Sequence, residues 1–210
     1  MALCFKHNDD HVNLTLWKIE EPLQYFLERI ILFPSEVELF ISLQSDRRKL
    51  EYAAARFLLR VMTGKREPLL YEESGRPVLN SGKQISISHC DGYIAVMLTQ
   101  NGQPGMDVEM ISPRAGKVKS KFLSIKELEL AGNDDMMLTL LWSAKEALFK
   151  MCIRQGINFK SNLSIESDNI TDGGILKTAI KKENQEAEIE LSYKVFEDIV
   201  LVWGVNNDDI

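Results

Sequence analysis

The sequence predicts an α+β protein with two similar subdomains, each of which contains helices followed by strands. In some segments apolar residues recur at every third or fourth position, as on one face of a helix. In others they alternate with polar residues, as in a half-buried strand, and helical patterns precede strand patterns in both halves. No low-complexity linker separates the halves. We therefore expect an N-terminal subdomain at residues 1–105 and a C-terminal subdomain at 106–210 that share an interface.

The first half opens with an alternating segment and continues into helical patterns. The longest helical pattern ends at Gly64, a residue that commonly terminates helices. Residues 64–84 are rich in glycine, proline, asparagine and serine, which is typical of turns. The predicted elements are a strand at 11–19, helices at 21–31, 35–43 and 46–62, and strands at 85–88 and 93–99.

The second half opens with a strand that carries acidic residues on one face, and a basic helical segment follows it. Asp172-Gly173-Gly174 is a turn signal between two of the later strands. The predicted elements are a strand at 106–111, a helical segment at 114–121, helices at about 124–132 and 134–152, and strands at 163–166, 175–181, 187–196 and 199–205.

Composition excludes several classes of protein. Of the 210 residues 45% are hydrophobic and 27% charged, which is ordinary for a folded globular chain. No segment approaches the roughly 20 apolar residues of a membrane span, and the first ten residues lack the apolar core of a secretory signal. The net charge of −6 argues against nucleic-acid binding. Cys4, Cys90 and Cys152 are too far apart for a disulfide framework or a CxxC pair, so we expect a reducing, cytoplasmic compartment.

Three acidic residues are the candidate metal ligands. Asp107 and Glu109 lie two apart on a predicted strand and project from the same face, and Glu146 lies in a helix further along the chain. Hard carboxylate oxygens of this kind suit Mg²⁺, which also accepts water and phosphate oxygens. Alternating acids on an exposed strand face would give the same pattern without a metal.

The segment from Trp142 to Lys150 is more specific. Glu146 and Lys150 are four residues apart, a spacing that stabilises any surface helix. That spacing does not explain why Lys145 adjoins Glu146, so that two cations flank one carboxylate. A site that binds both a metal and phosphates would explain this arrangement.

The histidines predict less chemistry by themselves. Ser88-His89-Cys90 ends a strand, lacks the G-x-S-x-G pattern of a nucleophile, and its adjacent residues point in opposite directions. A single histidine at a strand end is more often structural than catalytic. His7 and His11 are four apart, but no third zinc ligand is near them in the sequence.

Taken together and in order, the motifs resemble those of the Sfp-type 4′-phosphopantetheinyl transferases. The W-x-x-K-E-A-x-x-K element is the most specific, and the helix from Asp46 to Met62 is also similar to the family's N-terminal helix. Cys90 stands where the family usually has Ser or Thr, and Arg76 where Lys is common. The motifs are Gly75-Arg76-Pro77, Ile87-Ser88-His89, Gly105-Met106-Asp107-Val108-Glu109, Phe122-Leu123-Ser124 with Glu127, and Trp142 to Lys150.

The resemblance implies a monomer with two α/β subdomains related by a pseudo-twofold axis and coenzyme A bound in the cleft between them. Such enzymes transfer the phosphopantetheine arm of coenzyme A to a serine of an apo acyl or peptidyl carrier protein and release adenosine 3′,5′-bisphosphate. No nucleic acid or membrane takes part. The chemistry consists mostly of charge neutralisation and positioning.

The resemblance also implies a role for each candidate residue. Asp107, Glu109 and Glu146 would hold Mg²⁺, or Mn²⁺, on the pyrophosphate, and Lys150 would contact a pyrophosphate oxygen. Glu127 matches the proposed base for the carrier serine. The expected coenzyme A ligands are His89 and Arg56 at the 3′-phosphate, Arg48 beside them, and Arg76 and Ser88 along the nucleotide.

Residues 114–121 hold Arg114, Lys117, Lys119 and Lys121 without an acidic residue. This basic segment is either a solvated helix face or a docking site for an acidic carrier protein. Three other interpretations of the chain stay open. They are a metal-dependent nucleotide phosphohydrolase, a non-catalytic module that binds coenzyme A or a carrier, and a purely structural α+β protein.

Overall fold

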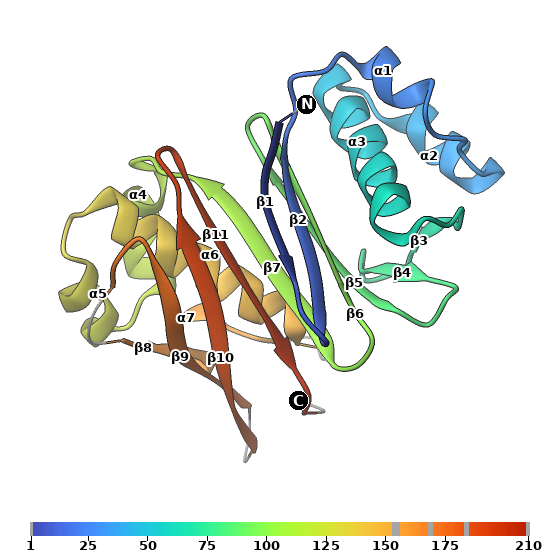
Figure 1. The fold of residues 1–210 in the computed structure, drawn as a ribbon. Helices are drawn as coiled ribbons and strands as arrows, with labels where there is room; N and C mark the ends of the chain where they lie inside the picture. Colours follow the sequence, from blue (N-terminus) through green and yellow to red (C-terminus); the bar gives the residue numbers. More distant parts are fainter. Residues whose placement is uncertain (1, 153–155, 168–169, 183–184, 209–210) are drawn as a thin grey trace. The chain divides into compact units, whose positions relative to one another are not determined.

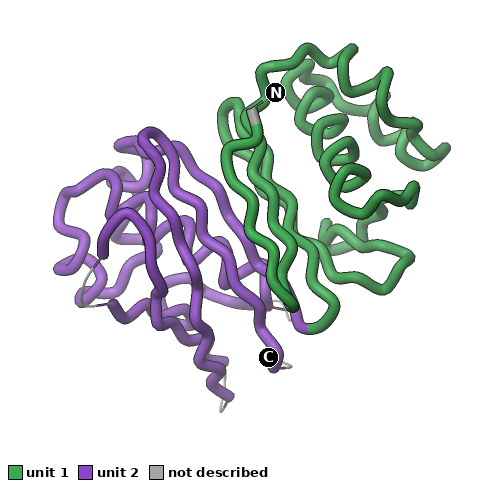
Figure 2. Tube along the Cα trace, viewed as in Figure 1, with its two compact units in different colours: residues 1–101 green, residues 102–210 purple. Residues whose placement is uncertain are grey.

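The computed structural model describes residues 2–152, 156–167, 170–182 and 185–208. The chain folds into two compact units, residues 1–101 (unit 1) and 102–210 (unit 2), which are coloured separately in Figure 2. Each unit holds an antiparallel sheet with helices packed against it (Figure 1). The α+β class expected from the sequence is confirmed.

Unit 1 is built on a four-stranded sheet in the order β1-β2-β6-β5. Its strands are β1 (Ala2–Asn8), β2 (Val12–Lys18), β5 (Gln84–Cys90) and β6 (Tyr93–Thr99). Helices α1 (Leu23–Leu27), α2 (Pro34–Ser42) and α3 (Asp46–Thr63) gather on one face of this sheet (Figure 1), and β3 (Leu69–Tyr71) and β4 (Pro77–Leu79) form a separate two-stranded ribbon. The core between helices and sheet includes Trp17, Phe26, Ala54, Leu58, Ile94 and Val96.

Helix α3 carries the first group of candidate residues, and its ends follow from the local sequence. The Ser45 hydroxyl accepts a hydrogen bond from the backbone N–H of Arg48 and so caps the first turn. Gly64 ends the helix with φ 65°, a left-handed conformation that favours glycine. Alanines and leucines on one face are buried against β6 and β2, and Arg47 and Arg48 lie in the first turn of the helix.

Unit 2 has a five-stranded sheet in the order β7-β11-β10-β9-β8. Its strands are β7 (Gln103–Met110), β8 (Leu163–Glu166), β9 (Gly173–Lys182), β10 (Gln185–Val195) and β11 (Ile199–Asn206). Its helices are α4 (Arg114–Phe122), α5 (Ile125–Ala131), α6 (Asp135–Met151) and α7 (Phe159–Asn162). Helix α6 lies across β7 and β11, and its apolar face, including Leu140, Leu141, Ala144, Ala147 and Leu148, forms the centre of the core.

The closest approach of helix to sheet in unit 2 occurs at Gly105 of β7. A Cβ atom at this position would overlap the backbone carbonyl oxygen of Ala147 in α6 and the side chain of Met151. Only a residue without a side chain allows α6 to lie this close to β7. The glycine therefore fixes the distance between the strand that carries Asp107 and the helix that carries Glu146.

Several short or edge elements differ from the sequence-based expectation. The expected helix at 21–31 is the five-residue α1, and β1, β3, β4 and α7 were not predicted. Strand β1 lies at the edge of its sheet, beside β2. Strands β3 and β4 have three residues each, which is too short for a periodic pattern. Residues 102–105, expected in the first subdomain, belong to unit 2, where β7 begins at Gln103 and pairs with β11 along its whole length.

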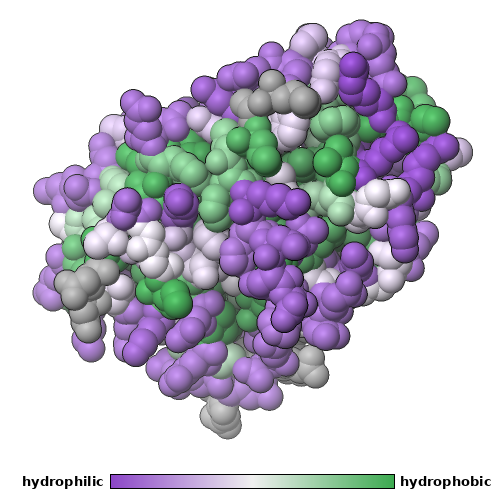
Figure 3. Space-filling model, viewed as in Figure 1, coloured by the Kyte–Doolittle hydropathy of each residue, from purple (hydrophilic) through white to green (hydrophobic). Residues whose placement is uncertain are grey.

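Small hydrophobic groups are interspersed with hydrophilic residues on the face drawn in Figure 3. None of the helices in the described part of the chain is long and apolar enough to cross a membrane.

Candidate functional site

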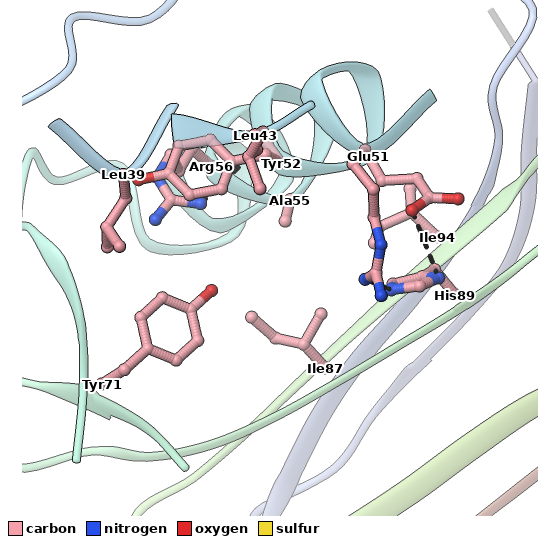
Figure 4. Close-up of a pocket in the computed structure, with 11 residues that line it drawn as sticks. Leu39, Leu43, Glu51, Tyr52, Ala55, Arg56, Tyr71, Ile87, His89 and Ile94 are labelled. Atoms are coloured by element: carbon pink, nitrogen blue, oxygen red, sulfur yellow. Dashed lines mark hydrogen bonds and ion pairs between the residues drawn. The ribbon is translucent and has the colours of Figure 1, made fainter. Parts of the chain in front are cut away.

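The candidate residues fall into two groups, one in each unit. In unit 1 they surround a pocket of about 290 Å³ (Figure 4). Apolar and aromatic side chains make up most of its wall, while His89 lies at one end (Figure 4), where the Arg48 guanidinium contacts it. Helices α2 and α3 and strands β3, β5 and β6 contribute the lining, which consists of Leu39, Leu43, Arg48, Glu51, Tyr52, Ala55, Arg56, Tyr71, Ile87, His89 and Ile94.

A chain of polar contacts fixes the charged end of this pocket. Arg48 Nη1 lies 3.3 Å from His89 Nε2, and His89 Nδ1 lies 3.5 Å from Glu51 Oε2. The other oxygen of Glu51 accepts a hydrogen bond of 2.8 Å from Arg47 Nε, which raises the pKa of Arg47. The carboxylate of Glu51 is almost fully buried and holds the imidazole in place, and the Arg48 guanidinium beside it makes this end of the pocket suitable for an anion.

Glu51 is a member of this group that sequence reasoning did not assign to the site. Its position four residues after Arg47 on α3 was the available signal, because that spacing places the two side chains side by side.

Arg56, expected at the 3′-phosphate, makes contacts inside unit 1 instead. Its Nε donates a hydrogen bond of 2.8 Å to Glu36 Oε1, and both side chains are at most 5% exposed. The guanidinium also lies 3.2 Å from the centre of the Tyr52 ring and donates to the Tyr52 carbonyl oxygen. A phosphate role for Arg56 stays a prediction, and this geometry does not support it.

Arg76 and Ser88 do not line the pocket. Strand alternation directs Ile87 and His89 into it, so Ser88 between them projects from the opposite face of β5 and is buried there. Arg76 is half-buried in the turn between β3 and β4. Their roles at the nucleotide stay predictions.

In unit 2, β7 and α6 bring the acidic residues together. Asp107 is almost fully buried, and its two oxygens accept hydrogen bonds of 2.9 Å from Ser143 Oγ and from Lys150 Nζ. Lys150 also donates to the carbonyl oxygen of Met106. One helix face thus holds the Asp107 carboxylate from both sides.

The two other carboxylates lie close enough to Asp107 to feel its charge. Burial, and then the negative charge of Asp107, raise the pKa of Glu146 to about 7 and also raise the pKa of Glu109. The Trp142 indole donates a hydrogen bond of 3.2 Å to Glu109 Oε1, and Arg114 stabilises the charged form of Glu109. Three mutually repelling carboxylates favour a bound cation.

The chemistry of these donors fits a hard divalent cation such as Mg²⁺. Even so, among residues 2–152, 156–167, 170–182 and 185–208, no three His, Cys, Asp or Glu side chains form a ready-made metal site. Asp107 explains why, because both of its oxygens already have partners on α6. The ligands are therefore close together but not arranged around a vacant position.

Lys145 occupies a different environment from the one its neighbour suggested. Its ammonium group is fully buried and donates a hydrogen bond of 2.8 Å to Glu127 Oε2. Three backbone carbonyl oxygens, those of Phe122, Phe159 and Leu163, lie 2.8–2.9 Å from the same nitrogen and share its two other N–H groups. The sequence suggested that Lys145, as the neighbour of Glu146, contributes a cation to a metal and phosphate site. This interpretation is wrong, because the ammonium group is buried and bonded within the core of unit 2.

Glu127, the expected base, is the partner of Lys145. One oxygen accepts from the backbone N–H of Ser124, which closes the capping box of α5, and the other accepts from the N–H of Ile165 in β8. The side chain is 3% exposed. A role as base stays a prediction, and it would require Glu127 to leave these contacts.

One lysine of the basic segment is also structural. Lys119 Nζ donates to the carbonyl oxygen of Gly132 at 2.8 Å and to Asn133 Oδ1 at 2.6 Å, so it caps the C-terminal end of α5. Arg114, Lys117 and Lys121 are exposed. These three side chains carry the positive face of α4.

Comparisons with known proteins agree on one family. The family model described as "4'-phosphopantetheinyl transferase superfamily" matches residues 103–202, and the one described as "4'-phosphopantetheinyl transferase N-terminal domain" matches residues 36–99. The chain is 27% identical over 112 residues to "4'-phosphopantetheinyl transferase AcpT" of Salmonella typhimurium and to the protein of the same name in Salmonella typhi. Each match covers 49% of this chain and 58% of the relative.

Proposed function

The chain belongs to the 4′-phosphopantetheinyl transferase superfamily, and from this we propose that it transfers the phosphopantetheine arm of coenzyme A to a serine of an apo acyl or peptidyl carrier protein. Adenosine 3′,5′-bisphosphate is the other product. The observation that carries the proposal is the group formed by Asp107, Glu109, Glu146 and Lys150, in which β7 and α6 place three carboxylates and one cation together.

In this proposal unit 1 holds the nucleotide end of coenzyme A. His89 and Arg48 at the charged end of the pocket bind the 3′-phosphate, and Glu51 keeps the imidazole oriented. Charge-assisted contacts to a phosphate are stronger than neutral ones and fix the position of the nucleotide before reaction.

In the same proposal unit 2 holds the pyrophosphate. Asp107, Glu109 and Glu146 are the residues that would hold Mg²⁺, or Mn²⁺, and the bound ion would neutralise charge on the pyrophosphate. Lys150 donates to a pyrophosphate oxygen and stabilises the charge of the departing bisphosphate. Ser143 and the Trp142 indole keep the Asp107 and Glu109 carboxylates in place.

Intact mass spectrometry tests this proposal. The protein is incubated with coenzyme A, Mg²⁺ and a panel of apo acyl and peptidyl carrier proteins, and we expect at least one carrier to gain the mass of a single phosphopantetheine group. The Asp107→Ala and Glu146→Ala variants, which should remain folded, are expected to abolish the gain.

Two results would contradict the proposal and identify an alternative. Release of free phosphate from the nucleotide without carrier modification would indicate a metal-dependent phosphohydrolase. Binding of coenzyme A or a carrier without any product would indicate a non-catalytic module. The same samples, analysed by light scattering, test our proposal that the active form is a monomer.

A further inference from the structure

Lys150 occupies the place in unit 2 where a metal ion would be expected to bind. Its Nζ atom lies 2.9 Å from Asp107 Oδ1 and 2.8 Å from the Met106 carbonyl oxygen. Lys150 therefore offsets part of the negative charge of the acidic group.

This contact disfavours a divalent cation on the same oxygen, because the two positive charges would lie close together. A cation bound to Asp107 Oδ1 would be repelled by the ammonium group, and Ser143 Oγ already donates to the other oxygen. Asp107 therefore coordinates a metal through Oδ1 more favourably once Lys150 has moved away. The side chain of Lys150 is 28% exposed and ends in a flexible ammonium group, so it can turn toward solvent without disturbing α6.

We propose that Lys150 is the resident cation of the acidic group and exchanges Asp107 for a pyrophosphate oxygen when coenzyme A binds. The exchange frees Asp107 Oδ1 for the divalent cation, so coenzyme A and the cation bind with positive cooperativity. Ser143 keeps its hydrogen bond throughout and acts as a positioning residue for the Asp107 carboxylate. The identity of the pyrophosphate ligand rests on the proposed function.

Cooperativity of this kind is reciprocal and can be measured from either side. If coenzyme A raises the affinity for the cation by some factor, the cation raises the affinity for coenzyme A by the same factor. A coupling of about tenfold or more is within the usual range for two linked sites.

Isothermal calorimetry with Mg²⁺ tests the exchange. Cation affinity is measured for the protein alone, with saturating coenzyme A and, separately, with inorganic pyrophosphate. For the unaltered protein we expect weak Mg²⁺ binding alone and binding at least about tenfold tighter with either ligand. The Lys150→Met variant should bind Mg²⁺ more tightly without ligand and should lose most of the coupling.

Three further variants separate exchange from general damage. Lys177→Met removes an exposed lysine of β9 and should behave as the unaltered protein. Lys150→Arg keeps the charge and should keep the coupling, which provides a folded comparison if Lys150→Met is unstable. Ser143→Ala should weaken Mg²⁺ binding by a similar factor with and without coenzyme A, because it affects positioning and not exchange.

The inference is overturned if the unaltered protein binds Mg²⁺ equally well with and without both ligands, or if Lys150→Met retains the full coupling factor. Neither result depends on carrier modification. Coupling without any carrier product would support the exchange while contradicting the proposed function, so the two failures are distinguishable.

Discussion

Among the described residues, each unit contains an ion pair whose two side chains are both almost fully buried, and the two pairs share most of their contacts. In unit 1 the carboxylate of Glu36 accepts the N–H of Phe33 at the start of α2, the N–H of Leu69 in β3, and Nε of Arg56 from α3. In unit 2 the carboxylate of Glu127 accepts the N–H of Ser124 at the start of α5, the N–H of Ile165 in β8, and Nζ of Lys145 from α6. Each glutamate thus joins a short helix, a later strand and the long helix of its unit.

The two pairs differ in the cation. Arg56 presents a flat guanidinium that stacks on Tyr52, and part of it lines the pocket of unit 1. Lys145 presents a compact ammonium group that is fully enclosed, and burial lowers its pKa. The comparison shows that a cation on the long helix can be a structural element of the core even when it lies within a motif that indicates phosphate binding.

The largest effect we expect is from Lys145→Met. The variant leaves the buried carboxylate of Glu127 without a counter-ion and removes the Lys145 donor from three carbonyl oxygens. Breaking a buried pair in this way costs about 3–5 kcal/mol. We expect the unfolding free energy to fall by about this amount, which urea denaturation would measure. The double variant Lys145→Met/Glu127→Leu should recover part of this loss. A single variant with unchanged stability would show that Lys145 does not join α6 to the core.

Glu127→Gln separates the structural role of Glu127 from the predicted role as base. The amide keeps the shape but weakens the bonds to Lys145 and to the two backbone N–H groups, so we expect a loss of about 1.5–3 kcal/mol in unfolding free energy. Below its melting temperature the variant should keep kcat for carrier modification. A stable variant with kcat lower by about 10²–10⁴-fold would instead establish Glu127 as the base.

A comparison of His89→Ala with Arg56→Lys tests which cation of unit 1 contacts the 3′-phosphate. Loss of a charge-assisted contact in His89→Ala should weaken coenzyme A by about 1.5–3 kcal/mol and leave dephospho-coenzyme A unaffected, as measured by calorimetry. Arg56→Lys should reduce stability and weaken both ligands to the same small extent. A loss that is selective for coenzyme A in Arg56→Lys would restore Arg56 to the phosphate site.

The smallest effects concern the basic face of α4. Lys119→Ser should lower the unfolding free energy by about 0.5–1.5 kcal/mol, because it removes the bonds to Gly132 and Asn133. Replacing Arg114, Lys117 and Lys121 together with Ser should leave stability unchanged and raise KM for an acidic carrier, most at low salt. If the triple variant shows the same KM and the same salt dependence as the unaltered protein, α4 is only a solvated face.

Much of the fold followed from periodicity, because long helices and paired strands have strong patterns. The segments expected to be helical at 46–62 and 134–152 match α3 and α6 within one residue at each end. The expected strand at 93–99 matches β6. Elements that depend on tertiary contacts, such as the edge strand β1, had no comparable signal. The pseudo-twofold relation between the subdomains stays a prediction.

The candidate site was predictable by residue type but not by direction. Lys145 and Glu146 are adjacent on α6, about 100° apart around the helix axis, and the sequence alone did not show which of them faced the core. The same uncertainty applied to Arg56, whose partner Glu36 lies twenty residues earlier in the chain. A contact at that separation depends on the fold of the whole unit and not on local spacing.

The absence of a side chain at Gly105 has a consequence for any attempt to redesign this protein. Even an alanine there would have to push α6 away from β7, and Ser143, Glu146 and Lys150 would all move with the helix relative to Asp107. Charge neutralisation at the acidic group depends on contacts of 2.9 Å, so a displacement of one ångström would break them. Gly105, which has no functional group, thus determines how closely the reactive residues of β7 and α6 approach each other. Mutant libraries directed at α6 should leave Gly105 unchanged.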